Sequence, residues 1–279
     1  MTLQYDEIGY WSEIKLDIVR EYATAYSRIL NAQQRPRLTH IYVDAFAGAG
    51  KHISKTTKEF VPGSPLNALQ VEPPFKEFHF IDIQSTRVEA LRELAVERGD
   101  VHVHEGDCNQ ILLDVVYPRA QFKNFRRALC LLDPYGLHLD WKVIETAGNM
   151  GSVEIFLNFP MMDMNRNVLW RNPEEVATEQ VERMNRFWGD SSWRSAAYTT
   201  RNLFELEMKA DHANDSVAQA FRQRLRTVAG FGYVPEPMPM RNSQGFVVYY
   251  LMFASPNKTG GNIVEDIFKK YRGRNSLMG

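Results

Sequence analysis

The segment HIYVDAFAGAG, residues 40–50, joins an apolar run to a loop of small residues, and the fold can be built outward from it. Its first half has the β-branched and aromatic residues of a buried strand, and its second half contains Gly48 and Gly50. Four further apolar runs follow, at 78–83, 101–104, 128–133 and 153–159, separated by helical or loop segments. Strands that alternate with helices form a buried, mostly parallel sheet with helices on both faces. The sequence therefore predicts a doubly wound, Rossmann-like α/β fold.

The flanking segments predict how this core is completed. Apolar residues recur at helical spacing before the first strand, which predicts an amphipathic helix over 11–33. Beyond residue 160 the alternation stops, and 161–213 reads as a helical insertion with a helix that starts near Pro173. The chain then returns as a C-terminal β-hairpin over about 231–255, with prolines in an edge strand, and ends in a helix over 262–271. We expect 1–160 and 214–279 to form one α/β domain and 161–213 to form a cap.

The composition excludes several protein classes. With 279 residues, 44% apolar and 24% charged, the chain is globular rather than disordered, collagenous or a coiled coil. No apolar run approaches the roughly 18 residues of a membrane span, and the N-terminus does not resemble a signal peptide, so we expect a cytoplasmic protein. Two cysteines, Cys108 and Cys130, are too few for a cysteine zinc cluster and are expected to be packing residues. Residues 216–279 carry nine Lys and Arg against three acids, which could orient an anionic partner.

The glycine-containing loop fits one ligand class better than two others. A phosphate-binding P-loop requires Gly at position 45 and Ser or Thr at 52, where the chain has Ala45 and His52. A dinucleotide fingerprint would need a third Gly at position 53, where the chain has Ile53, and an acid about 20 residues on, whereas the next acid at a strand end, Asp82, is more distant. The remaining pattern is D-x-F-x-G-x-G, with an acid, Asp44, at the strand end.

This pattern resembles the first motif of the class I S-adenosylmethionine-dependent methyltransferases. The resemblance implies that Asp44, Phe46, Gly48 and Gly50 lie at the methionine end of the cofactor, whose amino and sulfonium groups are cationic. It implies that Asp82, beside Ile83, accepts the ribose hydroxyls, and that Asp107, beside Cys108, accepts from the adenine amino group. Each acid alone could be a turn residue or a helix cap, and the combination favours a cofactor site.

The fourth apolar run ends in Asp133-Pro134-Tyr135-Gly136. A turn is the simplest interpretation. The motif is also similar to the D-P-Y/F-G of tRNA guanine dimethyltransferases and, less closely, to the D/N-P-P-Y/F of nucleobase amino-methyltransferases. That resemblance implies that Asp133 and the Pro134 carbonyl accept from an amine while Tyr135 stacks on its ring. Asn158, at the tip of the fifth strand, is placed to line the same pocket.

His102 and His104 lie two residues apart on one strand, a spacing that can chelate a metal. No third ligand is evident in the sequence, so we interpret both as structural residues.

Taken together, DAFAGAG, PGSPLNAL, FIDIQ, EGDCN, LLDPYG, LNFPMMDMNRN and YYLMFASPNKTG resemble the three-Cys-motif partner protein (TcmP) family over about residues 10–272. The family likeness implies a class I methyltransferase-like domain and a partner protein that carries the three-Cys motif.

Two hypotheses from different classes follow from the sequence. The first is an S-adenosylmethionine-dependent methyltransferase that acts on an amine, in particular an exocyclic amine of a nucleobase in DNA or RNA. The alternative is a non-catalytic, methyltransferase-like scaffold for the three-Cys-motif protein. A nicotinamide-dependent oxidoreductase is disfavoured by the glycine spacing.

Overall fold

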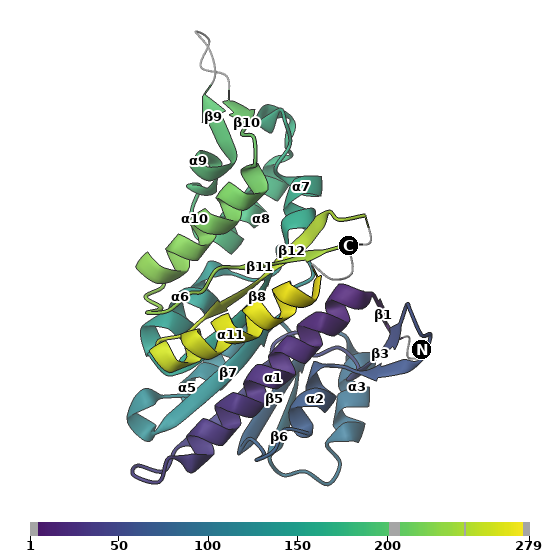
Figure 1. Cartoon of the computed structure of the whole chain (residues 1–279), viewed down its shortest axis with the longest axis vertical. Helices are drawn as coiled ribbons and strands as arrows, with labels where there is room; N and C mark the ends of the chain where they lie inside the picture. The colour runs from purple at the N-terminus through teal and green to yellow at the C-terminus, as the bar shows by residue number, and fades with distance from the viewer. Residues whose placement is uncertain (1–4, 201–206, 243, 276–279) are drawn as a thin grey trace.

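The computed structural model describes residues 5–200, 207–242 and 244–275 (Figure 1). Its centre is a seven-stranded sheet in the order β11-β12-β8-β7-β2-β5-β6. The bounds of the five strands predicted as apolar runs are β2 Thr39–Asp44, β5 Glu77–Asp82, β6 Val101–Glu105, β7 Arg126–Leu132 and β8 Val153–Phe159. These five are mutually parallel, and their order reverses at β2, as in doubly wound sheets. The predicted α/β architecture is confirmed.

The C-terminal hairpin completes one side of the sheet. Strand β12 (Val247–Ala254) pairs antiparallel with β8 on one side and with β11 (Met238–Arg241) on the other. Strand β11 is therefore the edge strand. This explains how it accommodates Pro239, because proline lacks a backbone N–H and an edge strand needs none on its unpaired side.

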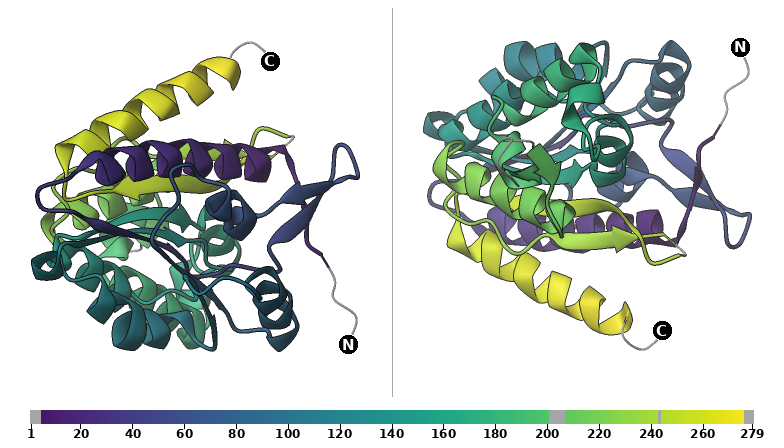
Figure 2. Two further views of the ribbon diagram at one scale, coloured as in Figure 1. Left: turned by 90° about the horizontal axis from the view of Figure 1, so that it is seen from below. Right: turned by 90° about the horizontal axis from the view of Figure 1, so that it is seen from above.

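Helices cover both faces of the sheet (Figures 1 and 2). One face packs against α1 (Tyr10–Ala32), α2 (Ser64–Leu69), α3 (Ser85–Leu94) and α11 (Lys258–Asn275). The other packs against α4 (Cys108–Ile111), the π-helical η1 (Leu112–Val116), α5 (Tyr117–Arg119), α6 (Trp141–Met150) and α10 (Ala213–Thr227). A short 3-10 turn, η2 (Phe122–Asn124), precedes β7. The final helix starts four residues earlier than expected, directly after the hairpin.

The insertion differs in detail from the prediction. The prediction that a helix starts near Pro173 is wrong. Pro173–Glu175 forms only a 3-10 turn, η3, because Val176 and Ala177 are extended. The helix α8 (Thr178–Trp188) begins after them. The other helices are α7 (Met161–Asn167) and α9 (Trp193–Ala197), and an unpredicted pair of strands, β9 (Tyr198–Thr200) and β10 (Glu207–Lys209), follows. Trp188 and Trp193 are buried in the same cluster as the sheet residues, so the insertion shares the main core.

A small second sheet lies beside the carboxyl ends of the main strands. It joins β1 (Glu7–Ile8), β3 (Lys51–Ser54) and β4 (Phe60–Pro62), and thereby holds the N-terminal segment next to the loop after β2. Within the described ranges, no helix combines the length and apolarity that crossing a membrane requires.

Candidate functional site

Four parallel strands bring the predicted acids to one edge of the sheet. Strand β2 ends at Asp44 and β5 at Asp82, while Asp107 follows β6 and Asp133 follows β7 directly. Because β7, β2, β5 and β6 are consecutive neighbours, their carboxyl ends adjoin. This edge is where doubly wound sheets bind ligands.

Two adjoining cavities open at this edge. The larger has a volume of about 560 Å³ and is lined by Phe46, Asp82, Ile83, Asp107 and Cys108, among others. The smaller, of about 350 Å³, is lined by Phe46, Gly48, Asp133, Pro134 and Asn158, among others. Phe46 and Tyr135 line both cavities, so the two are compartments of one cleft. Both volumes are in the range of small-molecule sites.

Asp82 is the most constrained acid of the larger cavity. Its side chain is buried, with Oδ2 accepting from the Gly48 backbone N–H at 3.0 Å and Oδ1 from the Gln84 backbone N–H at 2.9 Å. The Arg87 guanidinium lies 3.8 Å from Oδ2. A carboxylate has about four lone-pair sites, so each oxygen can still accept a second donor from the cavity. The geometry suits a pair of neighbouring hydroxyls.

The larger cavity is also lined by a second acceptor and by an apolar side chain. Asp107 caps α4, with Oδ1 accepting from the Asn109 backbone at 2.9 Å and from Asn109 Nδ2 at 3.0 Å, which leaves Oδ2 for a donor in the cavity. Ile83 is 72% exposed although it is apolar. An exposed aliphatic side chain beside a carboxylate fits a planar ring that carries an amino group.

Asp133 in the smaller cavity is held by two side chains. Lys15 of α1 donates to Oδ2, and Asn158 Nδ2 donates to Oδ1 at 2.6 Å. Burial alone would lower the pKa of the Lys15 ammonium, but the Asp133 carboxylate more than offsets this, so the pKa of Lys15 is raised. Asp133 is therefore fixed in position beside a permanent positive charge.

Tyr135 stands at the junction of the two cavities. Its hydroxyl donates to Asp6 Oδ2 at 3.1 Å and accepts from Arg87 Nη1 at 3.3 Å, and Arg87 also donates to Asp6 at 2.9 Å. Tyr135 is 58% exposed, although the Arg87 guanidinium lies over its ring, 5.5 Å from the centre, and burial raises the Tyr135 pKa. The ring is thus available to stack on a planar group.

Asp44 and Gly50 lie behind the cavity walls, since neither lines a cavity. Asp44 is fully buried. Its Oδ1 accepts from the Phe46 N–H at 3.3 Å, while its Oδ2 has no hydrogen-bond partner among the residues that the structure describes. Burial raises the pKa of Asp44 to about 7, against an opposing contribution from Ser64. Gly48 has φ +62°, and a Cβ built on it would meet no atom within 4 Å, so the missing side chain leaves room in the smaller cavity that this residue lines.

Sequence reasoning missed Lys15, Asp6 and Arg87. Lys15 is only 7% exposed, and its neighbours on α1, Ile14, Leu16 and Ile18, are buried apolar residues. A lysine in such a stripe is the signal that could have found it, because a buried ammonium needs an acid partner.

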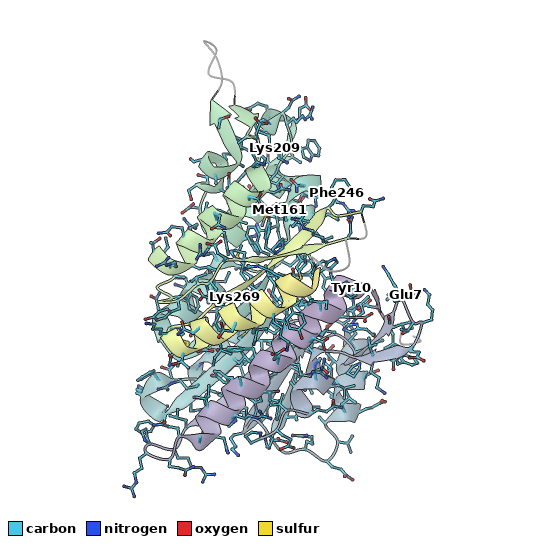
Figure 3. The ribbon with its side chains drawn as sticks, viewed as in Figure 1. Glu7, Tyr10, Met161, Lys209, Phe246 and Lys269 are labelled. Atoms are coloured by element: carbon cyan, nitrogen blue, oxygen red, sulfur yellow. The ribbon has the colours of Figure 1, made fainter. Side chains whose placement is uncertain are left out.

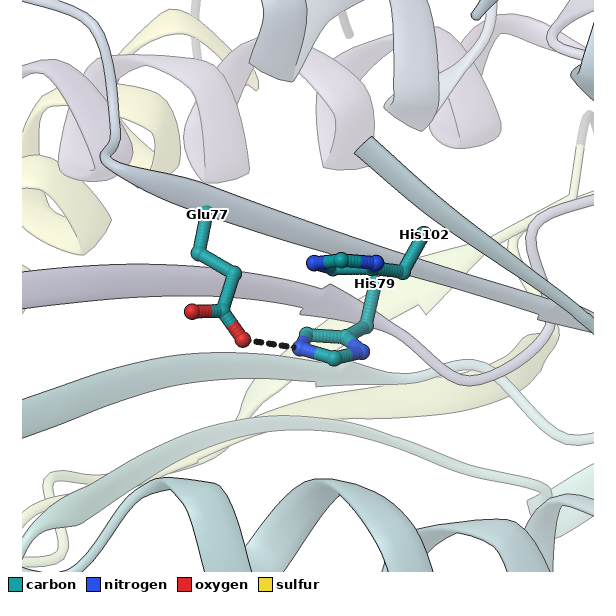
Figure 4. Close-up of side chains that lie close together, drawn as sticks. All are labelled: Glu77, His79 and His102. Atoms are coloured by element: carbon teal, nitrogen blue, oxygen red, sulfur yellow. Dashed lines mark hydrogen bonds and ion pairs between the residues drawn. The ribbon is translucent and has the colours of Figure 1, made fainter. Parts of the chain in front are cut away.

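A second polar cluster lies at the amino-terminal ends of β5 and β6 (Figure 4). Ligand atoms of Glu77, His79 and His102 lie within 4.8 Å of one another. However, Glu77 already binds Arg126 and Arg119, and His79 uses both ring nitrogens, on Glu77 at 2.7 Å and on His104 at 2.9 Å. Two guanidiniums on the carboxylate oppose a metal cation electrostatically. The cluster is a partly buried ion-pair network that joins β5, β6 and β7 near their starts.

Comparisons with known proteins address the fold. No protein-family model and no curated protein matches the chain. Among solved structures, protein LPL1258 from Legionella pneumophila (DUF519) is 10% identical, covers 92% of this chain and 91% of its own, and has a TM-score of 0.54. The fold is the Rossmann-like class I methyltransferase fold. A Thermobifida fusca protein described as a "putative methyltransferase" is 13% identical over 86% of this chain and 80% of its own, with a TM-score of 0.39.

Proposed function

We propose that this protein is an S-adenosylmethionine-dependent methyltransferase that transfers a methyl group to an exocyclic amine of a nucleobase in DNA or RNA. The proposal rests on one observation: a cavity with two strand-end carboxylates adjoins a second cavity that contains Asp133, Pro134 and Tyr135. The first suits a nucleoside, and the second suits a planar amine.

The residues of the larger cavity fit the adenosine part of the cofactor. Asp82 has acceptor capacity for the two ribose hydroxyls, Asp107 Oδ2 for the adenine amino group, and Ile83 supplies the apolar wall. The unpartnered Asp44 Oδ2 fits the cationic methionine end, reached through a water because Asp44 lies behind the wall. When bound, S-adenosylmethionine supplies a methyl group on a positively charged sulfur.

The residues of the smaller cavity activate and orient the acceptor. An aryl amine is a weak nucleophile because its lone pair is delocalised into the ring. Hydrogen bonds from its N–H groups to Asp133 and to the Pro134 carbonyl localise that pair, and the exposed Tyr135 ring stacks on the base. Lys15 and Asn158 hold the Asp133 side chain in place and use two of its lone-pair sites, which leaves sites for the amine.

We infer that the chain belongs to the three-Cys-motif partner family and acts with a protein of that motif. The insertion serves as the recognition element, with Trp170, 40% exposed, as its accessible tryptophan and Arg186 on the wall of the larger cavity.

Transfer of a labelled methyl group from S-adenosylmethionine to total cellular RNA and DNA tests the reaction. Wild-type protein should label one of them, and Asp133→Asn should abolish labelling while cofactor affinity stays within about threefold. Because Asp133→Asn leaves the Lys15 charge unpaired, Tyr135→Ala, at an exposed ring, provides a second variant that keeps the fold and should lower labelling at least tenfold. If wild-type protein binds the cofactor and labels neither nucleic acid, alone or with its partner, the scaffold hypothesis replaces this proposal.

A further inference from the structure

Two stretches of the chain without acidic residues meet at the sheet edge opposite the cleft. Residues 22–43 and 115–132 contain no Asp or Glu, and together they contain seven Lys and Arg residues in a chain of net charge −1. Strands β2 and β7 bring them side by side: Thr39 pairs with Arg126, and the Thr39 N–H donates to the Phe125 carbonyl at 3.0 Å. Lys76, directly before β5, lies beside them, since its backbone N–H donates to the His40 carbonyl at 2.9 Å.

Most of these cations have no acidic partner in the part of the chain that the structure describes. Arg119 and Arg126 bind Glu77, but within the described ranges Arg35, Arg37, Lys76 and Lys123 form no ion pair and are exposed. Unpaired cations concentrated at one edge create a positive potential that attracts polyanions.

Two phenylalanine rings are exposed among these cations. Phe122 and Phe125, in and directly after η2, are 55% and 51% exposed. The Arg127 guanidinium lies 3.7 Å from the centre of the Phe122 ring and so supports one of its faces. Phe125 has φ +56°, an unusual backbone conformation for a bulky residue. The turn therefore holds both rings in solvent instead of folding them into the core.

We propose that Arg35, Arg37, Lys76, Phe122, Lys123 and Phe125 form a second contact surface for single-stranded nucleic acid, here called the basic-aromatic surface. Its cations bind phosphates and its rings stack on bases, which is the combination that single-strand binding uses. This inference rests on the proposed function, in which the methyl acceptor is a nucleic acid, and it assigns a binding surface to the nucleotides that lie outside the cleft. Strand β2, six residues long, separates this surface from the cleft by about 20 Å. A strand that contacts both therefore extends several nucleotides beyond the modified base.

Fluorescence anisotropy with a labelled 20-nucleotide single-stranded RNA, and with DNA of the same sequence, tests the proposal. Arg37→Glu/Lys123→Glu should weaken binding about tenfold at 0.1 M salt. The plot of log K, with K the association constant, against log salt concentration should also become less steep by about 1.4, because each lost phosphate contact removes about 0.7 from the magnitude of its slope. Phe122→Ser should weaken binding with little change of slope. The matched control is Arg226→Glu/Lys269→Glu, which makes the same change of charge on α10 and α11 (Figure 3).

The outcomes separate this inference from the proposed function. If both double variants weaken binding equally, the effect is one of net charge and the surface is not a site. If polyglutamate competes as well as RNA and Phe122→Ser has no effect, the surface binds an acidic protein segment, and the inference is wrong. Cofactor affinity, measured by calorimetry, should be unchanged in Arg37→Glu/Lys123→Glu. Loss of the proposed function would instead appear as absence of cofactor binding in the wild-type protein.

Discussion

Replacing Lys15 by Met tests whether a buried charge pair holds Asp133 in place. The side chains of Lys15 and Asp133 are 9% and 26% exposed. Removing one partner of a fully buried pair costs about 3–5 kcal/mol, because the remaining charge is left without compensation. Here Asp133 retains its bond to Asn158 and some contact with solvent, so we expect a loss of about 2 kcal/mol. In a chain of this size that corresponds to a fall in Tm of roughly 5 °C.

Calorimetric unfolding at pH 7.5 measures this effect. Lys55→Met, at an exposed lysine, is the matched control and should change the free energy of unfolding by less than about 0.5 kcal/mol. Lys15→Met/Asp133→Asn should recover much of the loss, because the uncompensated carboxylate is gone. The reasoning is refuted if Lys15→Met is as stable as Lys55→Met, or if the double variant is less stable than both single variants.

Three further variants test the buried groups and the packing. Glu77→Gln should lower the free energy of unfolding by about 2–3 kcal/mol. Burial alone would raise the pKa of Glu77, but His79, Arg119 and Arg126 outweigh it and hold this pKa well below its usual value, so the stability that the Glu77 carboxylate contributes is lost as pH falls below about 4.5. The variant should therefore depend less on pH in urea unfolding at pH 3.5–6, and an unchanged dependence would contradict the network. Burial raises the pKa of both Asp44 and Glu154 to about 7, so the native state holds protons that the unfolded chain lacks between about pH 4.5 and 7. Wild-type stability should therefore fall as pH rises through that window, and Asp44→Asn/Glu154→Gln should flatten the curve; an unchanged slope would place the pKa values elsewhere. Gly148→Ala should cost about 3 kcal/mol in thermal unfolding, since its Cβ would lie 2.0 Å from the Ala229 carbonyl oxygen, whereas Gly99→Ala, with open space around it, should be nearly neutral.

The sheet and its acids could be predicted because their signals are local. Each buried parallel strand is a continuous apolar run, and an acid at the end of a run is assigned to the ligand-binding edge by the topology alone. The strand ends at Asp44 and Asp82 therefore agree with the prediction to within about two residues. The predicted roles of these acids remain predictions.

The parts that could not be predicted depend on contacts between distant segments. Lys15 and Asp133 are 118 residues apart, and nothing in the sequence sets how α1 crosses the end of β7. Likewise Pro173 fits a helix start locally, but the chain stays extended at Val176 and Ala177 before α8 begins. The exposure of the tryptophans in the insertion also depends on how α8 and α9 pack on the sheet. In the folded chain Trp170 is partly exposed, whereas Trp188 is buried.

Isothermal titration of the wild-type protein with S-adenosylmethionine tests the central claim most directly, with Asp82→Asn as the comparison. The account predicts saturable, one-to-one binding that weakens about 10- to 100-fold in Asp82→Asn, because a charged acceptor for the ribose hydroxyls contributes about 1.5–3 kcal/mol. Absence of binding to the wild-type protein at high micromolar concentration, or equal affinity in the two proteins, would contradict it.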